Sequence, residues 1–163
     1  MLLGSINHIS IAVSDLPRAM EFFRPLLEFL GYEVGKIGYY SPAATSLTVN
    51  INETNGTAFN VWQAEPGLAD HPFEVYEPGL HHVAFNAAHR EQVDQLAAMI
   101  PKIGGTILEG PGEYPFGGPE GYYSLYFLGP DRMKFEFVHM PLLERSAREM
   151  GRLETESKPP GAV

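Results

Sequence analysis

The chain has 163 residues, of which 44% are hydrophobic, and it carries a formal net charge of −9. This length and composition are enough to build the core of one compact domain. The negative charge repels phosphate backbones and anionic lipid, which argues against nucleic acid and membrane surfaces as partners and favours a small molecule. The chain contains no cysteine, which excludes disulfides, thiolate nucleophiles and sulfur ligands to a metal.

Membrane and secretion signals are not evident in the sequence. No apolar run approaches the roughly 20 residues that span a bilayer, and the first residues lead into a strand without a basic segment or cleavage site. The lack of cysteine fits a reducing compartment. We therefore expect a cytoplasmic protein.

The first half of the chain has the pattern of a β-α-β-β-β module, at about residues 5–63. Its first segment alternates as a strand does, which places His8 on the face of Ser10 and apolar residues on the other face. An amphipathic helix is predicted from Leu16 to its C-cap at Gly31, because apolar residues recur at helical spacing after an N-cap candidate and a proline. Strand candidates follow at residues 32–40, 45–51 and 57–63.

The second half repeats this pattern after a linker at 64–79 that is rich in Pro, Gly and acids. His82 opens its first strand, and His82 is as far from Gly105 as His8 is from Gly31. The second module, at about 80–140, has a helix at about 89–103 and strands at about 106–109, 122–128 and 133–139, with a long loop at 110–121 that is mobile or functional. A short charged helix and a polar tail are expected at 141–163.

Three residues at related positions of the repeat form a candidate metal site. With the strands side by side, His8, His82 and Glu136 converge on the concave face of the sheet, and Asn60 is the counterpart of Glu136. Two imidazoles and a carboxylate without sulfur suit Fe(II), Mn(II), Zn(II), Co(II) or Ni(II). The alternative is that each histidine is a hydrogen-bonded core residue and Glu136 lies at a solvated edge. The repeat symmetry favours the metal site.

Alternation also predicts which other side chains line the cavity. Those expected on the face of Glu136 are Tyr122, Ser124 and Tyr126, and those expected on the face of Asn60 are Ser46, Thr48, Asn50 and Trp62. Trp62 has two interpretations. It either lines a pocket for a flat or apolar substrate or belongs to the core.

The doubled pattern with His8, His82 and Glu136 resembles the vicinal oxygen chelate superfamily over about residues 5–140. That group includes glyoxalase I, extradiol ring-cleaving dioxygenases, fosfomycin-resistance thiol transferases, methylmalonyl-CoA epimerase and bleomycin-resistance proteins. The resemblance implies a single α+β domain over residues 1–163, in which two paired β-α-β-β-β modules form a curved, barrel-like mixed sheet around a metal cavity. It also implies a homodimer and a divalent metal that chelates two adjacent oxygens of a small substrate.

Two departures from family patterns bear on the chemistry. Glyoxalase I and the epimerases place a fourth ligand where this chain has Asn60, a poor ligand, so the three-ligand set is more similar to the extradiol dioxygenases and fosfomycin enzymes. Tyr126 resembles the tyrosine that hydrogen-bonds the substrate of the ring-cleaving dioxygenases, but Gly117-Gly118-Pro119 stands where those enzymes carry a histidine.

The resemblance therefore leaves two activities open, a glyoxalase-like lyase or isomerase and a ring-cleaving dioxygenase. In either one Tyr126 and Glu136 are the expected catalytic residues, and Asn60, Thr48, Trp62, Tyr122 and Ser124 are expected to bind substrate. The alternative is a metal-free protein that sequesters a drug, as the bleomycin-resistance proteins do.

Overall fold

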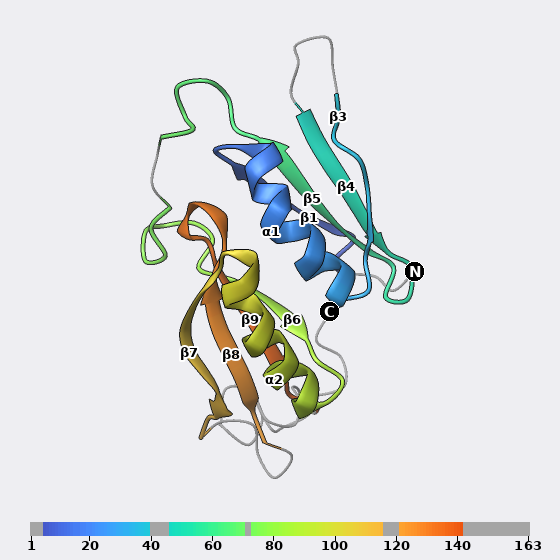
Figure 1. The fold of residues 1–163 in the computed structure, drawn as a ribbon, viewed down its shortest axis with the longest axis vertical. Helices are drawn as coiled ribbons and strands as arrows, with labels where there is room; N and C mark the ends of the chain where they lie inside the picture. The colour runs from blue at the N-terminus through green and yellow to red at the C-terminus, as the bar shows by residue number, and fades with distance from the viewer. Residues whose placement is uncertain (1–4, 40–45, 71–72, 116–120, 142–163) are drawn as a thin grey trace, which may run out of the picture. The chain divides into compact units, whose positions relative to one another are not determined.

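The computed structural model describes residues 5–39, 46–70, 73–115 and 121–141 (Figure 1). The chain divides into two compact units. The first comprises Met1–Glu74, Ile103–Gly105 and Gly129–Met133, and the second comprises Val75–Lys102, Thr106–Leu128 and Lys134–Val163. The helix and tail expected after Pro141 lie outside the described residues.

The first unit contains a mixed sheet with the strand order β1-β5-β4-β2, in which β3 also pairs with β4. The strands are β1 (His8–Val13), β2 (Glu33–Val34), β3 (Gly38–Tyr39), β4 (Ser46–Asn52) and β5 (Thr57–Gln63). β1 and β5 are parallel, and the other pairs are antiparallel. The strand predicted at 32–40 is split in two, because the N–H of Gly35 donates to the Asn50 side chain (3.2 Å) and leaves the ladder there.

Helix α1 (Leu16–Phe29) covers one face of this sheet, over β4 and β5 (Figure 1). Asp15 caps the helix by accepting from the N–H of Arg18 at 3.0 Å. Phe23 is fully buried, and its ring centroid lies 5.9 Å from that of Phe59 on β5. The apolar face predicted from helical spacing is therefore the face that forms the core of this unit.

The second unit contains a mixed sheet with the order β6-β9-β8-β7. Its strands are β6 (Val83–Asn86), β7 (Thr106–Glu113), β8 (Tyr123–Leu128) and β9 (Lys134–His139). The 3₁₀ turn η3 (Pro130–Arg132), which lies between β8 and β9 along the chain, belongs to the first unit. Helix α2 (Arg90–Met99) continues into the 3₁₀ turn η1 (Ile100–Ile103) and buries Val93 and Leu96. In the ranges that the structure describes, neither α1 nor α2 is long and apolar enough to cross a membrane.

The two sheets repeat one topology, which confirms the duplication. In each unit the first strand is parallel to the last, and the strands between them are antiparallel to their neighbours. The pairing after each histidine is also equivalent in the two sheets: Ser10 pairs with Asn60 in the first, and Ala84 pairs with Glu136 in the second. The protein is thus an α+β protein built of two β-α-β-β-β modules. Closure of the sheets around one cavity stays a prediction.

Strand β7 is longer than predicted and takes up the first part of the expected loop. It runs to Glu113 and pairs with β8 through two register shifts, one on each side of Glu109. Gly110 has a φ of +84°, and a Cβ at that position would collide with the carbonyl oxygen of Ser124. A bulge shifts the alternation of a strand, which is why the sequence pattern predicts a loop here. Residues 116–120 of that loop lie outside the described ranges.

We predict that Gly110→Ala lowers the free energy of unfolding by at least about 2 kcal/mol, because the new Cβ meets strain at positive φ and a collision with β8. Gly112→Ala is the matched control in the same strand, since nothing lies within 4 Å of a Cβ built there. Urea unfolding of both variants measures the difference. Equal midpoints for the two variants would contradict the close approach of β7 to β8.

Candidate metal and substrate site

The carboxylate of Glu136 is the centre of a hydrogen-bonded cluster in the second unit. Glu136 is only 3% exposed on β9. Its Oε1 accepts from Ser124 Oγ at 2.8 Å and from the Tyr122 hydroxyl, and its Oε2 lies 3.1 Å from His82 Nε2. A buried carboxylate is costly unless donors satisfy it. These three donors account for its burial and fix the direction of each oxygen.

His82 lies directly before β6 and is held through both ring nitrogens. Its Nδ1 is 2.6 Å from Nδ1 of His81, so one of these two atoms carries the hydrogen and the other accepts it. The pKa of His81 is lowered by loss of solvation and by the nearby charges of Lys134 and His82, which favours a neutral imidazole. A partner on the second ring nitrogen is what orients a metal-ligating histidine.

Two tyrosines stand beside the carboxylate. Tyr126 pairs with Glu136 across the β8–β9 ladder, and the hydroxyls of Tyr126 and Tyr122 are 2.7 Å apart. Burial raises the pKa of Tyr122, and its hydrogen bond to Glu136 raises it further. The pKa of Tyr126 is also raised, mainly by burial. Both phenols therefore stay protonated at neutral pH, so that they can donate hydrogen bonds.

The register places Tyr126 and Ser124 on the face of Glu136, as the alternation predicts. The structure adds Tyr114, which directly follows β7 and packs edge-on against the rings of Tyr122 and Tyr126 at centroid distances of 5.4 and 5.6 Å. The His82 ring also packs edge-on against Tyr126, at 6.0 Å. The carboxylate is thus enclosed by aromatic rings, which lower the local dielectric and strengthen its interactions.

The pair formed by His82 and Glu136 fits two neighbouring positions around a divalent metal. Two ligand atoms at right angles, each about 2.1 Å from an ion, lie about 3 Å apart, and His82 Nε2 and Glu136 Oε2 are 3.1 Å apart. Imidazole and carboxylate are ligands that Mn(II), Fe(II) and Zn(II) accept. In the described ranges, no three His, Cys, Asp or Glu side chains are grouped as a metal site. His8 belongs to the first unit, so the three-ligand set stays a prediction.

In the first unit His8 is exposed on the face of the sheet that α1 leaves uncovered. Its Nδ1 lies 2.8 Å from the side-chain oxygen of Asn7. Asn60 Nδ2 donates to Ser10 Oγ at 3.2 Å, whereas Asn60 Oδ1 is buried and accepts no hydrogen bond within the described part of the chain. The position equivalent to Glu136 thus carries a neutral amide whose acceptor is not satisfied.

The prediction that Thr48 shares the face of Asn60 is wrong. The register pairs Asn60 with Val49 and places Thr48 opposite Val61, on the side that packs against α1. Thr48 is fully buried there, and its hydroxyl donates to Met20 Sδ at 3.5 Å. The polar residues of β4 point inward because they satisfy one another and the backbone, as Asn50 does through Phe59 O at 2.7 Å.

Trp62 is half-buried and lines a mainly apolar hollow of about 450 Å³ in the first unit. Leu68, Phe73 and Met133 contribute to its walls. This volume is within the range of small-molecule sites, roughly 300–1,000 Å³. The geometry therefore supports the interpretation that Trp62 lines a pocket over the interpretation that it belongs to the core.

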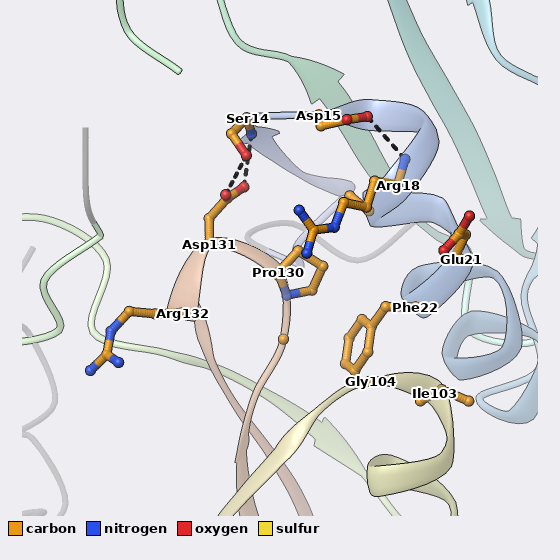
Figure 2. A pocket seen from close by; sticks show the side chains of 12 residues that line it. Ser14, Asp15, Arg18, Glu21, Phe22, Ile103, Gly104, Pro130, Asp131 and Arg132 are labelled. Atoms are coloured by element: carbon orange, nitrogen blue, oxygen red, sulfur yellow. Dashed lines mark hydrogen bonds between the residues drawn. The ribbon is translucent and has the colours of Figure 1, made fainter. Parts of the chain in front are cut away.

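A second hollow, of about 520 Å³, lies at the start of α1 (Figure 2). Asp131 accepts from the N–H and the hydroxyl of Ser14, at 2.8 and 2.5 Å, and Asp15 caps the helix. Arg18 and Arg132 also line this hollow, but Figure 2 shows the Arg132 side chain directed away from it. The two aspartates serve the backbone and the helix start, which indicates a structural role for this region.

Residues 5–137 match the family model of the Glyoxalase/Bleomycin resistance protein/Dioxygenase superfamily. The uncharacterized protein YqjT of Bacillus subtilis (strain 168) is 29% identical over 133 residues, which cover 82% of this chain and 97% of YqjT. A crystallised glyoxalase candidate from Bacillus halodurans is 31% identical, with a TM-score of 0.64 over 84% of this chain and 96% of that one.

A mutant of FosX, a fosfomycin resistance protein from Listeria monocytogenes, was crystallised with Mn(II) and 1S,2S-dihydroxypropylphosphonic acid. It is 19% identical, with a TM-score of 0.58 over 88% of this chain and 98% of FosX, which shows a likeness of fold alone. The match to the family model covers most of the chain, and so the protein belongs to the glyoxalase/bleomycin resistance/dioxygenase superfamily.

Proposed function

We propose that the protein is an enzyme that uses one divalent metal ion, bound by His82, Glu136 and His8, to hold a small substrate through two adjacent oxygens. The observation that carries the proposal is the partly buried contact of 3.1 Å between His82 Nε2 and Glu136 Oε2. When bound, the metal supplies a Lewis acid for the negative charge that develops on the substrate oxygens.

The residues around this pair have distinct roles in the proposal. Ser124 and Tyr122 hold Oε1 of Glu136, which leaves Oε2 directed toward His82. His81 orients the His82 ring through its Nδ1. Tyr126 is the hydrogen-bond donor to a substrate oxygen, because its raised pKa keeps the phenol protonated.

The chemistry we propose is either a glyoxalase-like rearrangement or the oxygen-dependent cleavage of a catechol. Asn60 occupies the position where a fourth ligand would stand, and this supports a three-ligand site with open positions for the substrate. The FosX structure combines the same fold with Mn(II) and a vicinal diol, which supports metal-dependent chemistry on adjacent oxygens. Mn(II), Fe(II), Zn(II), Co(II) and Ni(II) all suit the ligands.

A second candidate function is metal-free sequestration of an apolar small molecule. The observation that favours it is the hollow beside Trp62, whose walls are mainly apolar. A binding protein needs no metal, so metal content separates the two functions. In both, we propose a homodimer located in the cytoplasm.

We predict that the protein, purified without chelator or affinity tag, holds about one divalent metal per chain and that Glu136→Gln removes most of it. The substitution keeps the size of the side chain and its acceptor for Ser124 but removes the anionic ligand. Elemental analysis gives the occupancy. Glu109→Gln, the same change on β7 of the same sheet, is the control and should keep its metal. A metal-free wild type, or full occupancy in Glu136→Gln, would contradict the metal site.

We predict that Tyr126→Phe keeps its metal and its fold but loses on the order of 10²–10³ in turnover, as expected when one preorganised donor is removed. The assay uses Fe(II)-loaded protein with catechols and with thiol adducts of 2-oxoaldehydes, first without and then with oxygen. Oxygen uptake identifies ring cleavage, and oxygen-independent isomerisation identifies the glyoxalase-like reaction. Tyr123→Phe is the control, because that hydroxyl donates to Asp94 at 2.7 Å instead. Full turnover by Tyr126→Phe would refute the assigned role.

The raised pKa values of Tyr122 and Tyr126 predict a loss of stability at alkaline pH. Above about pH 10 the tyrosines of an unfolded chain ionise, whereas these two stay protonated in the folded protein. The stabilisation is therefore complete below about pH 10 and falls as the pH rises above it.

Urea unfolding at about pH 9 and about pH 11 measures this loss. Tyr122→Phe should reduce the loss, whereas Tyr76→Phe should not, because Tyr76 is 89% exposed. Ultraviolet titration of the folded protein should also resolve tyrosines that ionise at a higher pH than the exposed ones. Ionisation of all eight tyrosines in one step near the ordinary pKa would count against the buried cluster.

A further inference from the structure

We propose that Lys134 binds an anionic group of the substrate, so that the substrate is a carboxylic or phosphorus-containing acid that also carries two adjacent oxygens. This inference rests on the proposed function and names the substrate class for that site. Lys134 is the first residue of β9, two positions before Glu136.

Lys134 lies on the same face of the sheet as the candidate metal ligand. Alternate residues of a strand share a face, so Lys134 and Glu136 project to one side and Phe135 and Phe137 to the other. The register agrees, because Lys134 pairs with Leu128 and Glu136 pairs with Tyr126, two residues earlier on β8. Phe135 and Phe137 are 1% and 2% exposed and fill the core of the unit. The lysine therefore faces the site.

The ammonium group is held next to the proposed donor. Lys134 Nζ lies 4.8 Å from the centroid of the Tyr126 ring, within the range of a cation–π contact. The His82 ring packs against the same tyrosine at 6.0 Å. The Tyr126 ring thus contacts both His82 and the ammonium group of Lys134.

No anion of the described protein neutralises this charge. In the described ranges no carboxylate oxygen lies within 4.0 Å of Lys134 Nζ, and the ion pairs there are Arg24–Glu28, His82–Glu136 and Arg90–Glu113. Glu136 is engaged by Tyr122, Ser124 and His82 instead. Lys134 is half-buried as a residue, and a lysine that loses part of its solvation without a counter-charge is unfavourable. An incoming anion would relieve this cost through a charge-assisted hydrogen bond.

The spacing along β9 sets the size of the substrate. Backbone positions two residues apart on a strand are separated by about 7 Å, and on this spacing we place the anionic group roughly one aromatic ring away from the oxygens at the metal. An aromatic ring with a vicinal diol at one end and an acid at the other has this length. Catechol and 3,4-dihydroxybenzoate are therefore matched probes, since they share the chelating oxygens and differ by the remote carboxylate.

The test is calorimetric titration of the Mn(II)-loaded protein with catechol, 3,4-dihydroxybenzoate and 3,4-dihydroxyphenylphosphonate. We expect the wild type to prefer at least one acid over catechol by about tenfold or more, the effect of one hydrogen bond to a charged group. The acid that binds better distinguishes a carboxylate from a phosphorus-containing group. Lys134→Met and Lys134→Gln should lose the preference, Lys134→Arg should keep it, and all three should keep their metal.

Lys102→Met removes the same charge from an exposed position and should leave the preference unchanged. Equal affinity of the wild type for catechol and both acids, failure to bind either acid, or a preference that survives in Lys134→Met would overturn the assignment. If the protein takes up no Mn(II), the proposed function fails on its own. In that case, the ratio of the affinities for the acids and for catechol, measured on chelator-treated wild type and Lys134→Met, still decides the role of Lys134.

Discussion

The buried carboxylate of Glu136 is the constraint on which the rest of the second unit depends. Removing a carboxylate from water costs several kcal/mol unless its oxygens are satisfied. Ser124 and Tyr122 satisfy one oxygen and His82 meets the other. These donors come from β8, from the residue before it and from the residue before β6, so the carboxylate links three segments of the unit. Gly110 lets β7 approach the backbone of β8 closely at Ser124, the residue that donates to Glu136.

The two units show how a duplicated module acquires different roles. Both units keep the same strand order, and in both the first strand is parallel to the last, β1 to β5 and β6 to β9. At the equivalent position, however, the first unit carries the neutral Asn60 and the second the charged Glu136. The cost of burial then explains the different surroundings. The amide needs no set of three donors, and its unit instead forms an apolar hollow beside Trp62. In the account proposed here, one module supplies most of the charge and the other supplies apolar binding surface.

Periodicity in the sequence was enough to predict both modules, the strand at 57–63 and the shared face of Ser124, Tyr126 and Glu136. It failed for Thr48, because alternation tells which residues share a face but not which face is buried when the buried residues are polar. It also failed at β7, because a bulge shifts the period. Lys134 follows the alternation, but that its charge has no carboxylate partner in the described residues depends on side-chain positions that the sequence pattern does not give. Local periodicity also does not determine whether His8 joins the other two proposed ligands, because His8 belongs to the other unit.

The central claim is that His82 and Glu136 share one metal ion, and X-ray diffraction from crystals soaked in Mn(II) tests it most directly. The account predicts one anomalous peak per chain, about 2.0–2.2 Å from His82 Nε2 and Glu136 Oε2, with His8 as the third protein ligand. A chain without such a peak, or with the ion bound elsewhere while His82 and Glu136 remain hydrogen-bonded to each other, would contradict it.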